Sequence, residues 1–203
     1  MAKNRGKLTK AIRDAVLSEY NHLCSICGAV RPHIHHIDEN PENHDPLNLL
    51  PLCPNHHLTD AHNPTKKMDP LKIGLFRRYK DPQILSPQFE PLFQRLRFLL
   101  VPFDRDEDGH ALSGRAGDVV MFVEHFVMGR YYASRLRILL QWPQPKPYTD
   151  AEKEQVLLEN TAFYRERLLK NREHVLELVV ELLRYQTWLP FNNDRSSRFD
   201  PEH

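Results

Sequence analysis

Residues 24–57 read CSICGAVRPHIHHIDENPENHDPLNLLPLCPNHH, and this stretch decides how the first part of the chain folds. It contains all three cysteines of the 203-residue sequence. An odd number of cysteines set among histidines argues against a disulfide framework and favours thiolates that are kept reduced as metal ligands. The stretch therefore predicts a small unit that is held together by metal coordination.

Two pairs of candidate zinc ligands stand near the ends of this stretch. Cys24 and Cys27 are separated by two residues, and so are Cys53 and His56. Such a pair can grip one tetrahedral zinc ion, because the turn between its members brings both ligand atoms to the same side. We therefore predict a structural Zn²⁺ bound by Cys24, Cys27, Cys53 and His56, which replaces the hydrophobic core that so short a segment lacks.

The residues around these pairs predict a minimal set of elements. Thr9 can cap a helix over residues 10–19, where apolar side chains recur at intervals of three and four. A short strand is expected to end at His36, and an apolar run over residues 47–52 predicts a second strand. Pro54 then opens another helix. Two strands and a helix around metal make a unit too small to fold well without the ion.

Beyond residue 64 the pattern changes to long amphipathic helices. Asp69 and Ser86 each precede a proline, which is typical of a helix cap followed by a first-turn proline. A further helix is predicted over residues 118–141, and a last one from about residue 149 to residue 188. The fold class is therefore α+β, with a small metal-stabilised domain followed by a mostly helical one.

The last predicted helix carries a seven-residue repeat. The repeat includes Leu157, Tyr164, Asn171, Leu178 and Tyr185. Such a repeat could form the seam of a dimer, with the asparagine fixing its register. Further apolar residues widen the stripe beyond a two-stranded seam, which favours packing against helices of the same chain.

The charge and hydropathy of the chain indicate what it can contact and where it is located. Residues 1–80 carry a net charge of +4 and residues 81–203 a net charge of −3. Lys3, Arg5 and Lys7 belong to an N-terminal arm without acidic residues, which suits contact with a phosphate backbone or a solvated tail equally well. No apolar run approaches the ~20 residues of a membrane-spanning helix, and no signal peptide is evident. We expect a cytoplasmic protein without membrane contact.

The adjacent histidines His35 and His36 lie between the two zinc pairs. A neutral imidazole with a pKa near 6.5 can take a proton from water at neutral pH. The neighbouring imidazole can bind a divalent cation that offsets charge on a phosphorane transition state. This combination suits phosphodiester hydrolysis.

The order of these motifs resembles the HNH endonuclease family in its zinc-containing form. The resemblance rests on Cys-x-x-Cys, His-His-Ile, Asn-Leu and Leu-Cys-x-x-His-His, and it covers roughly residues 9–62. It implies a ββα-metal fold and a divalent metal. It also implies cleavage of double-stranded DNA to 5′-phosphate and 3′-hydroxyl ends. The change of pattern after residue 64 predicts two domains, a nuclease domain over residues 1–66 and a helical domain over residues 67–203.

The resemblance implies a role for each matching residue. His36 corresponds to the general base, and His35 to the preceding ligand of the catalytic metal, for which Mg²⁺ or Mn²⁺ is expected. His57 corresponds to a metal ligand or a phosphate contact. Asn48 either holds the loop that orients the base or binds the metal itself, and the sequence leaves both roles open.

The chain also departs from the family pattern. Most zinc-containing relatives have a cysteine where this chain has His56, although zinc accepts either ligand. His62 stands one residue later than the second helical histidine of relatives, so we assign it only a phosphate contact. Lys66 and Lys67 are expected to contact nucleic acid as well, as are Lys3, Arg5 and Lys7 in the arm.

Several basic residues have weaker signals. Arg77, Arg78 and Lys80 could extend a DNA track, although one face of their helix must also pack inward. His22, His33 and His44 have no partner at a recognised ligand spacing, and we interpret them as surface or loop residues.

Three classes of function follow from these patterns. The leading hypothesis is a metal-dependent DNA endonuclease, restrained by a partner protein or by oligomerisation through the C-terminal helices, as in effectors of anti-phage defence or nucleases of mobile elements. The second is a zinc-stabilised nucleic-acid adaptor without catalysis. The third is an RNA-cleaving enzyme, because phosphodiester chemistry does not distinguish the two sugars.

Overall fold

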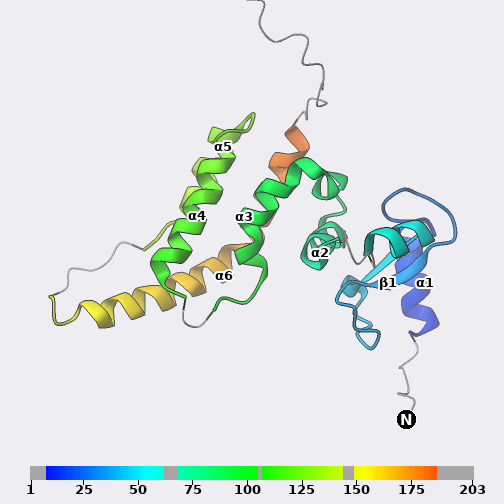
Figure 1. The fold of residues 1–203 in the computed structure, drawn as a ribbon, viewed down its shortest axis with the longest axis horizontal. Coiled ribbons are helices and arrows are strands. Elements are labelled where there is room, and N and C mark those ends of the chain that lie inside the picture. Colours follow the sequence, from blue (N-terminus) through cyan, green and yellow to red (C-terminus); the bar gives the residue numbers. More distant parts are fainter. Residues whose placement is uncertain (1–7, 62–67, 105–106, 144–148, 187–203) are drawn as a thin grey trace, which may run out of the picture.

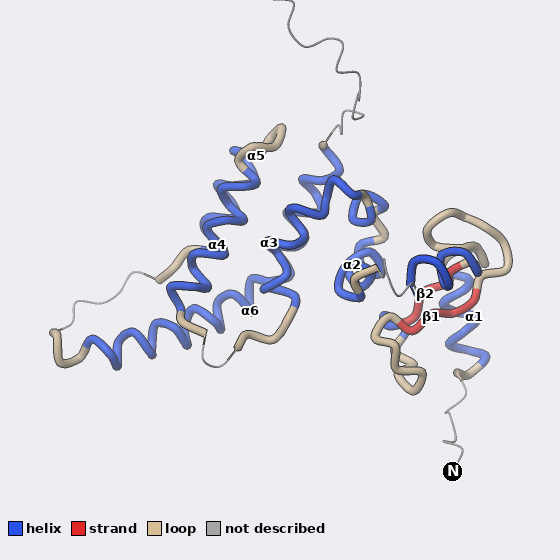
Figure 2. The backbone as a smooth tube through the Cα atoms, viewed as in Figure 1, coloured by secondary structure: helices blue, strands red, loops and turns tan. Residues whose placement is uncertain are grey.

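The computed structural model places a small two-stranded unit at one end of the molecule and a group of long helices at the other (Figure 1). Helix α2 lies between the two parts (Figure 1). The strands are confined to the N-terminal end, and the rest of the described chain is helical or loop (Figure 2). The residues that the structure describes are 8–61, 68–104, 107–143 and 149–186.

The N-terminal unit begins with helix α1, whose bounds agree with the prediction. The Thr9 side chain caps the helix by accepting a hydrogen bond from the backbone N–H of Ile12, at 3.4 Å. Val16 and Leu17 are its buried residues. The elements of this unit are α1 (Lys10–Glu19), β1 (His33–His36), η1 (Pro46–Asn48), β2 (Leu49–Leu52) and the π-helix η2 (His56–Ala61).

The two strands form an antiparallel hairpin in which His35 pairs with Leu50 and His36 with Leu49. Every residue of β2 is buried, whereas only His35 of β1 is buried. The predicted strands are therefore present, but the second one is shorter than expected because residues 46–48 form a 3-10 turn. Asp45 caps that turn by accepting a hydrogen bond from the N–H of Leu47.

The C-terminal part consists of helices, and none among the described residues is long and apolar enough to cross a bilayer. Asp69 caps α2 as predicted, and accepts a hydrogen bond from the N–H of Leu71. Ser86-Pro87 begins a 3-10 turn and not the helix itself, which starts at Glu90. The elements are α2 (Pro70–Tyr79), η3 (Pro82–Leu85), η4 (Pro87–Phe89), α3 (Glu90–Leu100), α4 (Gly109–Val123), α5 (Gly129–Leu140) and α6 (Lys153–Tyr185).

The single helix predicted over residues 118–141 is wrong, because two helices meet there. Met128 has a left-handed backbone with φ of 61°, which ends regular helical geometry. Gly129 follows, and a Cβ atom at that position would come within 2.1 Å of the Val123 carbonyl oxygen. The chain therefore turns back sharply at a position that only glycine can fill.

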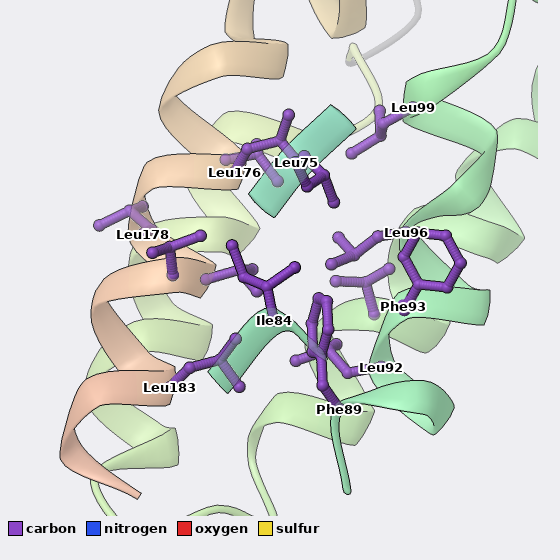
Figure 3. Close-up of a cluster of buried hydrophobic side chains, with 14 of the residues drawn as sticks. Leu75, Ile84, Phe89, Leu92, Phe93, Leu96, Leu99, Leu176, Leu178 and Leu183 are labelled. Atoms are coloured by element: carbon purple, nitrogen blue, oxygen red, sulfur yellow. The ribbon is translucent and has the colours of Figure 1, made fainter. Parts of the chain in front are cut away.

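Helix α6 starts four residues later than predicted and supports the adjoining helices. Tyr164, with no exposed surface, donates a hydrogen bond to the Leu140 carbonyl, and Asn171 donates one to the Leu139 carbonyl. The polar residues of the heptad repeat thus bind α5 of the same chain. Figure 3 shows part of the core that α6 shares with other elements, including Leu75, Ile84, Phe93, Leu96, Leu176 and Leu183.

Candidate metal centre and adjoining histidine cluster

The first ligand pair lies in a tight turn between Leu23 and Val30, which form an isolated bridge. The N–H of Gly28 donates to the Cys24 carbonyl, and the N–H of Cys24 donates to the Ala29 carbonyl. Gly28 has φ of 71°, a conformation that glycine adopts without strain. This turn aims both thiols in the same direction.

The second pair completes a cluster of four ligand atoms. The sulfur and nitrogen atoms of Cys24, Cys27, Cys53 and His56 all lie within 4.8 Å of one another. Cys27 Sγ is 3.8 Å from Cys53 Sγ, and His56 Nδ1 is 3.5 Å from Cys24 Sγ and 3.2 Å from Cys53 Sγ. Ligand atoms around a tetrahedral zinc ion are about 3.5 to 3.8 Å apart. The cluster can hold a structural zinc ion, as the sequence predicts.

The environment of Cys24 favours the thiolate that zinc requires. Burial alone would raise its pKa, but hydrogen bonds from the backbone N–H groups of Cys27, Cys53 and Ile26 outweigh that effect, and His56 adds to them. The pKa of Cys24 is lowered to about 6. Because metal binding needs a deprotonated sulfur, the backbone prepares this residue for coordination at neutral pH.

Three imidazole rings gather on one side of strand β1. The centroid of the His57 ring is 5.3 Å from that of the buried His35 and 6.3 Å from that of His33. Strand geometry explains the pairing, since residues two apart point to the same face. The N–H of His57 donates to the Cys53 carbonyl, so the backbone of this histidine is tied to a zinc ligand. The structure thus brings His35 and His57 together, and adds His33, which sequence reasoning did not include.

His36 projects from the opposite face of the same strand. Its ring centroid lies 6.0 Å from that of His44, and its Nε2 atom is buried without a hydrogen bond to any described residue. Burial lowers the pKa of His36 below its usual 6.5, His44 lowers it further, and Asp38 opposes the shift. These effects therefore favour the neutral imidazole.

Asn48 fastens the loop that follows the histidine pair. Its side-chain oxygen accepts a hydrogen bond from the N–H of Asp38, and its amide donates to the Asp38 carboxylate and the Asn43 carbonyl. Desolvation would raise the pKa of Asp38, but hydrogen bonds from Asn43, Asn40 and Asn48 lower it. Of the two roles left open by the sequence, the loop-holding contacts are those that the structure describes.

The remaining predictions concern a second metal site and the nucleic-acid contacts. Within the described side chains, no second group of three histidine, cysteine or acidic ligands comes as close together as the zinc cluster. Six of the predicted nucleic-acid contacts lie outside the described residues, namely Lys3, Arg5, Lys7, His62, Lys66 and Lys67.

Arg77 has a structural position that the sequence did not reveal. Only 3% of its surface is exposed, and its guanidinium donates to the carbonyls of Pro46 and Leu49. Both terminal nitrogens also bind Glu19, at 3.1 and 2.6 Å. Arg77 therefore ties α2 to α1 and to the start of β2, and the idea that it extends a DNA track is wrong. Its only sequence signal is a position on the inward face of an amphipathic helix.

Comparisons with known proteins give no match, whether with protein-family models, curated proteins or solved structures.

Proposed function

We propose that this chain is a metal-dependent endonuclease that hydrolyses DNA phosphodiester bonds and leaves 5′-phosphate and 3′-hydroxyl ends. The observation that carries the proposal is the ring-to-ring placement of His35 and His57, 5.3 Å apart, beside a cluster of four zinc ligands.

In this proposal each residue has one role. His36 accepts a proton from the attacking water, and Nδ1 is the nitrogen that does so because Nε2 is buried. His35 and His57 would hold a divalent cation, Mg²⁺ or Mn²⁺, through their ring nitrogens. When bound, that cation offsets the negative charge that builds on the phosphate.

The two faces of β1 divide these tasks. His36 is the last residue of the strand, followed at once by the loop that Asn48 fastens to Asp38. A scissile phosphate placed over the end of the strand would meet His36 from one face of the strand and His35 with His57 from the other. Asn48 is a positioning residue here, because it fixes the backbone directly after His36.

In this proposal the helical part restrains the nuclease. It leaves large apolar side chains exposed around the α4–α5 turn, among them Val127, Met128 and Tyr131. A partner protein or a second copy of the chain could cover them and control the nuclease, as an effector of anti-phage defence or a mobile element requires. Light scattering of the purified protein tests self-association directly. A protein that stays monomeric at all concentrations would leave a partner protein as the source of restraint.

Plasmid nicking tests the catalytic proposal. The wild-type protein with added Mg²⁺ or Mn²⁺ should convert supercoiled DNA to open circles, and chelation should stop it. His36→Ala should lower the rate by at least about 100-fold, as expected for loss of a general base. His125→Ala, a histidine of the helical part whose ring contacts the Met121 carbonyl, is the matched control.

Two results would redirect the proposal to the alternatives. Tight DNA binding without cleavage under any of these metals would favour the nucleic-acid adaptor. Cleavage of RNA and not of DNA would favour a ribonuclease built from the same residues.

A further inference from the structure

An open cleft of about 740 Å³ lies beside strand β1, outside the residues assigned above to zinc binding or catalysis. Helix α1, the turn after it and the start of β1 all contribute to its lining. Four of its side chains are basic or imidazole groups, and no acidic residue lines it. These four are Arg13, His22, Arg31 and His33. The cleft therefore has the charge of an anion-binding site.

Among the residues that the structure describes, the two arginines of this cleft have no counter-ion. Neither Arg13 nor Arg31 makes a side-chain hydrogen bond or ion pair with a residue in the described ranges. A second cleft, of about 470 Å³, offers a comparison, because it is lined by three arginines that all have acidic partners. Those pairs are Arg95–Asp118, Arg97–Asp69 and Arg115–Glu107. Unpaired guanidinium groups that converge on one cleft are available to a ligand, whereas the paired ones are not.

The cleft adjoins the histidine cluster. His33 lines the cleft, and its ring centroid is 6.3 Å from that of His57. The chain also holds two of the lining residues in left-handed backbone conformations, with φ of 59° at both His22 and Arg31. Glycine, asparagine, aspartate and histidine adopt this conformation more readily than other residues, so the cost falls on Arg31. Arg31 is thus kept at a position that favours a smaller residue for folding.

We propose that this cleft binds backbone phosphates of duplex DNA next to the bond that is cut, with Arg13 and Arg31 as the charged contacts. The inference rests on the proposed function, since it continues the substrate path from His57 through His33 to the two arginines. It assigns a phosphate-binding role to residues that are outside the catalytic set. Contacts of this kind position a duplex without reading its sequence.

The test measures binding without cleavage, by fluorescence anisotropy of a labelled DNA duplex with no divalent cation added. The variant combines Arg13→Gln, which keeps a good helix former, with Arg31→Asn, which suits a left-handed backbone. Each lost phosphate contact should make the slope of log affinity against log salt concentration shallower by about 0.9. The slope of the double variant should therefore be shallower than that of the wild type by about 1.8. At ~0.1 M salt its affinity should fall by more than about tenfold.

A matched control carries the same change in net charge on the helical part. Arg130→Gln with Lys170→Gln alters two exposed residues of α5 and α6, and its salt slope should equal that of the wild type. Equal slopes for the cleft variant and the wild type would overturn the cleft assignment even if the wild type nicks plasmid. A reduced slope in a protein that never cuts DNA would uphold the cleft and refute the nuclease. Binding of RNA but not of the duplex would overturn the assignment to DNA.

Discussion

The two parts of this chain are stabilised in different ways. Residues 8–61 form two short strands and a few turns of helix around four residues that could hold a zinc ion, and their buried side chains join a hydrophobic cluster whose larger part belongs to α2 to α6. A hydrophobic core loses stability gradually as side chains are trimmed, but a metal-held unit loses its fold when one ligand goes. Under the proposed function, the chemistry of this protein depends on the part with the least core of its own.

Loss of a zinc ligand should have the largest effect. Cys24→Ser should unfold the N-terminal unit, because structural zinc contributes folding free energy of order 10 kcal/mol in small domains. The α3–α6 helices should remain folded, so circular dichroism should retain most of its helical signal while bound zinc is lost. Ser25→Ala, at a neighbouring position that is not a ligand, is the control. A variant that keeps its zinc and an unchanged melting curve would contradict the metal-held description.

Arg77 gives the second largest effect, because it joins the two parts. Arg77→Ala leaves the carbonyls of Pro46 and Leu49 and the Glu19 carboxylate without their donor, and should lower the free energy of unfolding by about 3 kcal/mol. Arg78 is the matched control, since it is half exposed and pairs with Glu173. Arg78→Ala should cost less than about 1 kcal/mol. Urea unfolding of both variants measures the difference, and equal losses would mean that Arg77 is an ordinary surface pair.

How far the sequence predicts this structure depends on how local each signal is. The bounds of α1 agree with the prediction because Thr9 and the apolar spacing act within one helix. The zinc cluster was predictable because ligand spacing is a local constraint, even across the 25 residues between the two pairs. Both features are visible in the sequence of the residues that form them, without knowledge of distant contacts.

The missed features depend on tertiary contacts. Gly129 is a weak local signal in residues 118–141, and the need for glycine comes from a close backbone approach to the Val123 carbonyl. The burial of Arg77 depends on Glu19, which is 58 residues away in the sequence. The ring contacts of His33 with His57 and of His36 with His44 likewise connect segments that the sequence pattern treats separately.

A moderate effect is expected in the loop after β1. Asn48→Ala removes three hydrogen bonds that hold residues 38 and 43, and should lower the free energy of unfolding by about 1 to 2 kcal/mol. Asn40→Ala, which removes one exposed loop hydrogen bond, should cost less than about 0.5 kcal/mol. Denaturant unfolding compares the two. Identical midpoints for Asn48→Ala and the wild type would show that the loop does not need this fastening.

The smallest expected effect is on the pH dependence of the free energy of unfolding. The hydrogen bond from Arg77 lowers the pKa of Glu19 below its usual 4.5, against the opposing effect of burial, and Lys80 adds to the decrease. Because the folded pKa is the lower one, this stabilisation is complete above pH of about 4.5 and is lost as the pH falls through the folded value. Unfolding free energies measured from neutral to acidic pH should therefore decline more steeply for the wild type than for Glu19→Gln. Parallel curves would contradict the assigned contribution.

The central claim is that the metal-held unit performs hydrolysis with His36 as the base, and chemical rescue tests it most directly. His36→Gly should abolish plasmid nicking while zinc content and the helical melt stay as in the wild type. Added imidazole should then restore nicking in proportion to its concentration, because a free base can fill the vacated space. A His36→Gly protein that cuts as fast as the wild type, or one that stays folded and inactive at every imidazole concentration, would contradict the claim.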